Sequence, residues 1–117
     1  MVVQVSKRVR LRSLPVLTDE ASAPVFRALG DPTRLAILAR LAAACGARRV
    51  GDIAGCCTVD LYVVSRHLAV LRQAGVVESR RVGREVFYEV RYAEVVALLR
   101  QLAAAMEACC VKKGNQP

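Results

Sequence analysis

The chain has 117 residues, enough for one domain with a modest core, and 55% of them are hydrophobic, which excludes an intrinsically disordered protein. It contains no run of about 18 uncharged apolar residues and no N-terminal signal pattern, so we expect a cytoplasmic protein without a membrane span. The formal net charge of +8 indicates an acidic partner, most simply nucleic acid. An anionic membrane surface is the competing partner, and it is disfavoured because the basic residues do not form one amphipathic helix.

The chain begins with a segment that we expect to be a flexible basic arm, residues 1–17. This arm either contacts the DNA backbone or stays solvated. One folded domain is predicted over residues 18–110. Its first helix is capped by Thr18 or Ser22 and ends near Leu29.

A second helix is predicted from Pro32 to about Ala44, with Asp31 as its N-cap. Its buried face is expected to consist of four residues with Ile37 beside them: Leu35, Leu38, Leu41 and Ala42. Cys45 follows the helix among alanines and is interpreted as a small packing residue.

The segment from Asp60 to Gly75 has the period of a helix with two different faces. The face predicted to be buried consists of Leu61, Val64, Leu68 and Leu71. The opposite face presents polar and cationic groups suited to a DNA major groove, namely Tyr62, Ser65 and Arg66, with His67 and Arg72 at its margins. An ordinary helix with a solvated polar face is the alternative.

A short helix is predicted over Val50–Cys57, and residues 58–60 form the turn that joins it to the next helix. Two helices joined by such a turn, the second with a polar outer face, form a helix-turn-helix.

After Gly75 the apolar pattern changes to period two, which predicts strands over residues 76–82 and 85–90 joined around Gly83. The turn is flanked by Arg80, Arg81 and Arg84, which either probe phosphates and the minor groove or only solubilise the turn. The fold class is therefore mainly α with a small β-hairpin.

A last helix is predicted from Ala93 to Cys110, with apolar residues on more than one stripe. The excess apolar surface predicts a homodimer interface. Residues 111–117 are expected to be a disordered tail.

Three segments, GDPTRLAILARL, GDIA and VVSRHLAVLRQAGVVESRRVGREVFYEV, closely resemble the ArsR/SmtB repressors, which are small dimeric winged-helix proteins that sense metals. The resemblance covers about Val25–Cys110. It implies four helices, a β-hairpin and a fifth helix, a homodimer on double-stranded operator DNA, and a repressor rather than an enzyme. It also implies that four residues lie at or near the DNA, namely Tyr62, Ser65, Arg66 and His67.

The metal sites of the family are absent from this sequence. Many arsenic-sensing members carry Cys-x-Cys where this chain has Arg49 and Gly51. The zinc-sensing members use Asp, His and Glu on the last helix, whereas the one histidine here is His67, in the recognition helix.

Four of the five cysteines form two adjacent pairs, Cys56–Cys57 and Cys109–Cys110. Adjacent thiols do not easily close a disulfide, but their thiolates can ligate a soft ion. We therefore predict a thiophilic inducer that releases the DNA, Hg(II) or As(III) before Cd(II), Pb(II) or Zn(II). The alternatives are cysteines that only pack, a repressor that responds to thiol oxidation or to no metal, and, least favoured, a thiol oxidoreductase, which would need a Cys-x-x-Cys motif or a βαβ pattern.

Overall fold

The computed structural model describes residues 20, 22–55 and 60–114, and the side chains of these residues up to residue 108. Pro24–Tyr92 form one compact unit, and the chain from Ala93 onward belongs to another. The predicted basic arm lies outside the described residues. So do Cys56 and Cys57, as well as the side chains of Cys109 and Cys110.

Helices α3 (Ala23–Leu29) and α4 (Pro32–Ala44) follow each other closely, as predicted. The Asp31 carboxylate accepts the backbone N–H of Arg34 at 3.1 Å, and Pro32 occupies the first turn, where its missing N–H costs nothing. The helix ends at Cys45, which has the left-handed φ of 55° and whose N–H bonds the carbonyl of Ala42. Cys45 is exposed, so its interpretation as a packing residue is wrong; it forms the C-cap, where glycine usually stands.

The buried face of α4 differs from the prediction. Ile37 and Leu41 are fully buried, whereas Leu35 is 48% exposed and Ala42 is also exposed. Apolar residues occur around most of this helix, so their spacing alone could not decide which side faces α6 and β3. The contacts with these two elements select the side that holds Ile37 and Leu41.

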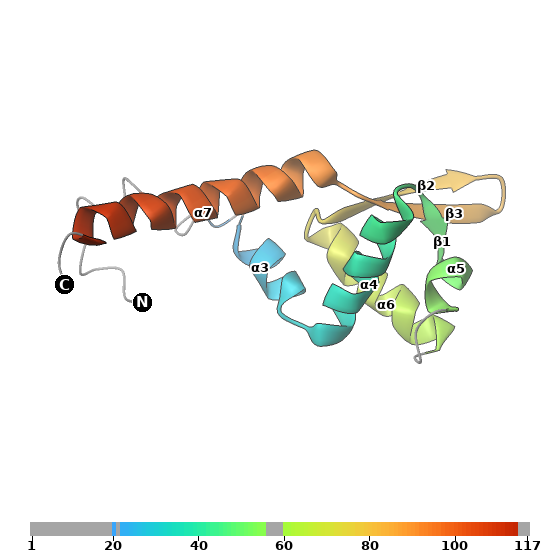
Figure 1. Ribbon diagram of the computed structural model, residues 1–117. Helices are drawn as coiled ribbons and strands as arrows, with labels where there is room; N and C mark the ends of the chain where they lie inside the picture. The colour runs from blue at the N-terminus through green and yellow to red at the C-terminus, as the bar shows by residue number, and fades with distance from the viewer. Residues whose placement is uncertain (1–19, 21, 56–59, 115–117) are drawn as a thin grey trace. The chain divides into compact units, whose positions relative to one another are not determined.

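The helix-turn-helix consists of α5 (Val50–Ala54) and α6 (Leu61–Gln73), which lie next to each other (Figure 1). The Asp60 carboxylate caps α6 by accepting the N–H of Val63 at 3.0 Å. Val64, Leu68 and Leu71 are fully buried, as predicted, but Leu61 is 53% exposed. Leu61 is the first residue of the helix and lies beyond the end of the core, so its assignment to the buried stripe is wrong.

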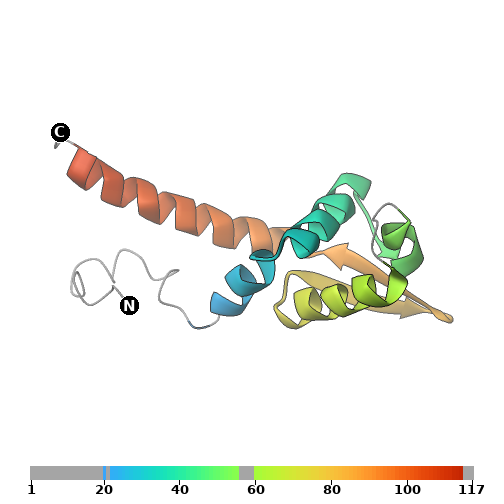
Figure 2. The ribbon, with the colours of Figure 1, turned by 90° about the horizontal axis from the view of Figure 1, so that it is seen from below.

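The hairpin consists of β2 (Val77–Val82) and β3 (Glu85–Val90), which pair in antiparallel register with Val82 opposite Glu85. Gly83, with φ +65°, forms the turn, a conformation that side chains rarely adopt. A strand that the sequence did not predict, β1 (Arg48–Arg49), pairs with β3 and gives a sheet of order β1-β3-β2 (Figure 1). Figure 2 shows the two strands of the hairpin from below. The observed fold is mainly helical with a small antiparallel sheet.

The last helix, α7 (Tyr92–Gly114), continues past the expected end at Cys110, so the prediction of a disordered tail is wrong for residues 111–114. Residues 115–117 lie outside the described residues. Val95 and Ala105 are buried, whereas three other apolar side chains are exposed by 42–57%, namely Val96, Leu99 and Met106. Within the described residues, no helix is both long and apolar enough to cross a membrane.

Candidate nucleic-acid interface

The exposed face of α6 carries the predicted polar residues. Tyr62 is 68% exposed, and the guanidinium of Arg66, one turn later, lies 5.8 Å from the centre of the Tyr62 ring. This cation–π contact leaves the hydrogen-bond donors of Arg66 available and limits the directions in which the guanidinium can point. Ser65 lies beside Tyr62 and is partly buried.

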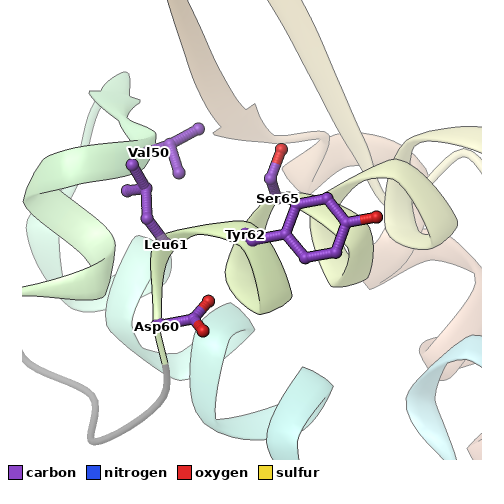
Figure 3. Close-up of a pocket in the computed structure, with 5 residues that line it drawn as sticks. All are labelled: Val50, Asp60, Leu61, Tyr62 and Ser65. Carbon is purple, nitrogen blue, oxygen red and sulfur yellow. The ribbon is translucent and has the colours of Figure 1, made fainter.

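A hollow of about 600 Å³ opens at the start of this face (Figure 3). Its lining combines two aliphatic side chains, Val50 and Leu61, with three that carry oxygen, Asp60, Tyr62 and Ser65. Leu61 extends toward Val50, so the beginning of α6 and the beginning of α5 together form the apolar side of the hollow.

The side chain of His67 lies at the margin of the exposed face and is oriented by residues at the start of α4. Its Nδ1 lies 3.4 Å from a guanidinium nitrogen of Arg34 and 4.0 Å from a carboxylate oxygen of Asp31. Arginine has no acceptor, so Nδ1 accepts and Nε2 carries the ring proton when the ring is neutral. Arg34 is itself held by the carbonyl of Ala28, at 2.7 Å. His67 therefore connects the recognition helix to the start of α4.

The cationic side chains predicted at the hairpin are all exposed, at positions 80, 81 and 84. In the part of the chain that the structure describes, no ion pair is recorded for Arg80, Arg81 or Arg84. Arg72, in the last turn of α6, is also exposed. These guanidinium groups are therefore available to a polyanion without first breaking a salt bridge.

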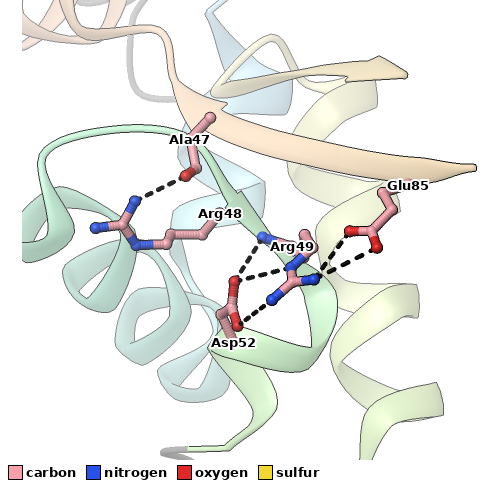
Figure 4. A network of polar contacts seen from close by, with 5 residues as sticks. All are labelled: Ala47, Arg48, Arg49, Asp52 and Glu85. Carbon is pink, nitrogen blue, oxygen red and sulfur yellow. Dashed lines mark hydrogen bonds and ion pairs between the residues drawn. The ribbon is translucent and has the colours of Figure 1, made fainter. Parts of the chain in front are cut away.

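Arg49 forms a polar network that the sequence did not reveal (Figure 4). Its guanidinium pairs with Asp52 at 3.2 Å and with Glu85 at 3.0 Å. The hydrogen bonds to Asp52, and next those to Glu85, raise the pKa of Arg49, and the same contact with Arg49 lowers the pKa of Asp52. The network joins β1 and α5 to the first residue of β3. The spacing of Arg49 and Asp52 was a visible signal, but nothing in the sequence pointed to Glu85.

The structure thus brings Tyr62, Ser65 and Arg66 together on one exposed face and places three exposed arginines on the hairpin of the same unit. Among the described side chains, no group of three or more His, Cys, Asp or Glu residues could hold a metal ion. The four cysteines predicted as ligands lie outside those side chains, so their arrangement remains a prediction.

Residues 29–80 match the model of a helix-turn-helix domain family. The chain is 37% identical to an uncharacterised helix-turn-helix-type transcriptional regulator of Methanocaldococcus jannaschii, over 71% of this chain and 96% of that protein. It is 39% identical to a transcriptional repressor SmtB homolog of Synechocystis, over 69% and 60% of the two chains. It is 35% identical to a probable mercury resistance operon repressor of Streptomyces lividans, over 85% and 82%.

Two solved structures show the same architecture. An ArsR-like transcriptional regulator from Rhodococcus superimposes with a TM-score of 0.68 at 31% identity, over 85% of this chain and 95% of that one. A homodimeric winged helix-turn-helix DNA-binding domain from Mycobacterium bovis, a possible ArsR-family regulator, gives a TM-score of 0.61 at 29% identity, over 88% and 91%.

Proposed function

The chain belongs to the ArsR/SmtB family of winged helix-turn-helix transcriptional repressors, and from this premise we propose that it binds operator DNA as a homodimer and is released when a thiophilic ion binds its cysteines. The family consists of DNA-binding regulators and not of enzymes. Beyond membership of the family, we propose which residues contact the operator, which ion induces release and which residues bind that ion.

The observation that carries the DNA-binding part is the combination of the α6 face with the hairpin. Tyr62, Ser65 and Arg66 have the donors and the short polar groups that read base edges in a major groove. His67 and Arg72 flank this face. The wing arginines, Arg80, Arg81 and Arg84, supply exposed charge for phosphates or the minor groove.

The dimer part of the proposal is supported by α7. A row of exposed apolar side chains on one long helix is unfavourable in water and suits the same helix of a second copy. Val96, Leu99 and Met106 supply that surface. The homodimeric relative from Mycobacterium bovis supports the same assignment.

The described residues do not fit the metal sites known in the family. Where arsenic sensors have the first cysteine of Cys-x-Cys, this chain has Arg49, whose guanidinium is already paired with two carboxylates and would repel a cation. The carboxylates of Asp52 and Glu85 are occupied by that arginine. Within its described side chains, α7 offers Glu94 and Glu107 but no histidine.

The remaining donors are Cys56, Cys57, Cys109 and Cys110, and this set of thiols fits a soft ion. When bound, such an ion supplies strong thiolate coordination whose free energy can be linked to the release of DNA. Cys56 and Cys57 stand in the segment that connects α5 to the recognition helix, which makes them the pair closest in sequence to the DNA-contacting face. The mercury resistance relative favours Hg(II), with As(III) as the next candidate and Cd(II) or Pb(II) after it.

The test measures the anisotropy of labelled duplexes, selected by the reduced protein from a randomised library, during separate titrations with Hg(II), As(III), Cd(II), Pb(II) and Zn(II) at fixed salt. Release by one thiophilic ion would support the sensor. The double variants Cys56→Ser/Cys57→Ser and Cys109→Ser/Cys110→Ser should each lose part or all of the response. Cys45→Ser is the matched control, because Cys45 is an exposed thiol that caps α4.

A response that survives in both double variants would contradict the assignment of the ligands. A protein that stays on DNA through all five ions would contradict the metal part of the proposal. In that case the alternative, a repressor that responds to thiol oxidation or to no metal, is tested by repeating the titration with an oxidant.

A further inference from the structure

We propose that the apolar side of the hollow at the start of α6, formed by Leu61 and Val50, contacts the 5-methyl group of a thymine, with Leu61 as the residue that recognises it. The inference rests on the proposed binding of operator DNA and adds which chemical feature of the operator is read. It assigns a specificity role to a side chain that the apolar pattern had placed in the core.

The first observation is the exposure of Leu61. The other apolar residues of its stripe are fully buried, yet Leu61 leaves 53% of its surface exposed in the first turn of the recognition helix. The first turn of such a helix is the part that contacts base edges in helix-turn-helix complexes. An aliphatic group at this position therefore meets the major groove, where the thymine methyl is the apolar feature of a base pair.

The second observation is the composition of the hollow. Val50 and Leu61 form a small apolar patch, and Tyr62 and Ser65 place hydroxyl groups at its border (Figure 3). An occupant that suits this lining has a small apolar group with polar atoms next to it. Thymine has this pattern, because its O4 acceptor lies beside the methyl group and can accept a hydrogen bond from a hydroxyl.

The third observation concerns charge. Asp60 is the acidic side chain of the lining, and its carboxylate caps the helix through the N–H of Val63. The positive end of the helix dipole offsets part of this negative charge. Arg66 extends from the same face and is available to a phosphate or a guanine. The capped carboxylate therefore does not exclude a DNA duplex, and the positive charge for its phosphates comes from Arg66, outside the lining of the hollow.

The test replaces thymine by deoxyuridine, which removes the methyl group and changes nothing else. In duplexes selected by the wild-type protein from a randomised library, each thymine is replaced in turn and the Kd is measured at fixed salt. We expect one position in each half-site where the replacement weakens binding about fourfold, the effect of losing one buried methyl group. The same replacement in both half-sites should weaken binding about fifteenfold, because the two sites are independent.

The variant Leu61→Ala should bind the thymine and deoxyuridine duplexes equally well, whereas Leu61→Met should keep most of the difference. Val70→Ala is the matched control, because Val70 is an apolar residue of the same helix that is 40% exposed. This variant should discriminate between the thymine and deoxyuridine duplexes as well as the wild type does. Circular dichroism and sedimentation confirm that each variant keeps its fold and its association state.

A wild-type protein that is indifferent to deoxyuridine at every position would overturn the inference, and this result depends on no variant. A Leu61→Ala protein whose ratio of Kd values for the deoxyuridine and thymine duplexes equals that of the wild type would also overturn it. So would a Leu61→Ala protein that loses self-association, since the hollow would then contact a second copy. Failure to select any duplex would overturn the proposed binding of operator DNA as well. Selection of a duplex without sensitivity to deoxyuridine would overturn only the inference about thymine.

Discussion

The charge on the hairpin gives the sharpest quantitative test of the proposed interface. Arg84 stands in the turn between β2 and β3, beside Gly83, and its side chain is exposed. The substitution Arg84→Gln keeps most of the length and polarity of the side chain and removes its charge. It should leave the fold unchanged, because the turn conformation depends on Gly83.

The expected effect follows from the release of counterions by DNA. Each phosphate contact contributes about 0.9 to the slope of log K against the logarithm of the salt concentration. A dimer presents Arg84 twice, so the variant should have a slope less steep by about 1.8. At about 0.15 M salt this difference corresponds to binding that is roughly 30-fold weaker, provided that the affinity extrapolated to about 1 M salt is unchanged.

The assay is anisotropy of a fixed duplex over a series of salt concentrations, with wild type, Arg84→Gln and Arg40→Gln measured side by side. Arg40 is an exposed arginine of α4 and controls for the loss of one charge per protomer. If Arg84→Gln and Arg40→Gln change the slope equally, the wing does not contact phosphates and its arginines act only through the net charge.

Three further predictions concern the scaffold. Leu68→Ala should lower the free energy of unfolding by about 2–5 kcal/mol in urea titrations, because Leu68 is fully buried; a loss under about 1 kcal/mol would contradict its place in the core. Asp60→Ala removes the cap of α6 and should cost about 1 kcal/mol in the same assay, with Asp60→Asn as the near-neutral comparison. The contact with Arg49 lowers the pKa of Asp52 from its usual 3.8. The ion pair therefore stabilises the folded protein fully above about pH 4, and this stabilisation is lost as the pH falls through the lowered pKa of Asp52 in the folded state. Asp52→Asn should therefore be less stable than wild type at neutral pH and equally stable in strong acid, and a constant difference would contradict the ion pair.

Most of the helical scaffold was predictable because its signals are local. Asp31 with Pro32, Asp60, and Gly83 each fix a start or a turn through their own backbone chemistry, and the observed elements begin or turn at those residues. Such signals need no knowledge of distant contacts.

The features that were missed depend on contacts between distant segments. β1 is two residues long and forms because it pairs with β3, and a strand of two residues is too short to show an alternating apolar pattern in the sequence. The buried side of α4 is chosen by its neighbours, and the exposure of Leu61 results from its position beyond the end of the core. Of the candidate site, the face with Tyr62 and Arg66 followed from helical spacing, whereas the contact of His67 with Arg34 joins residues 33 positions apart and was not visible.

The strand order has a consequence for the free protein. With β1 covering one side of β3, the strand β2 forms the other edge of the sheet, and an open edge is a template for pairing with another chain. Glu78, Arg80 and Arg81 are exposed along this edge, and the two arginines on each copy repel those of the next. We therefore expect the cations proposed to hold phosphates to disfavour edge-to-edge pairing of free copies as well. Polyanions that neutralise them without presenting a groove, such as polyphosphate, should make the protein more prone to self-association than operator DNA does.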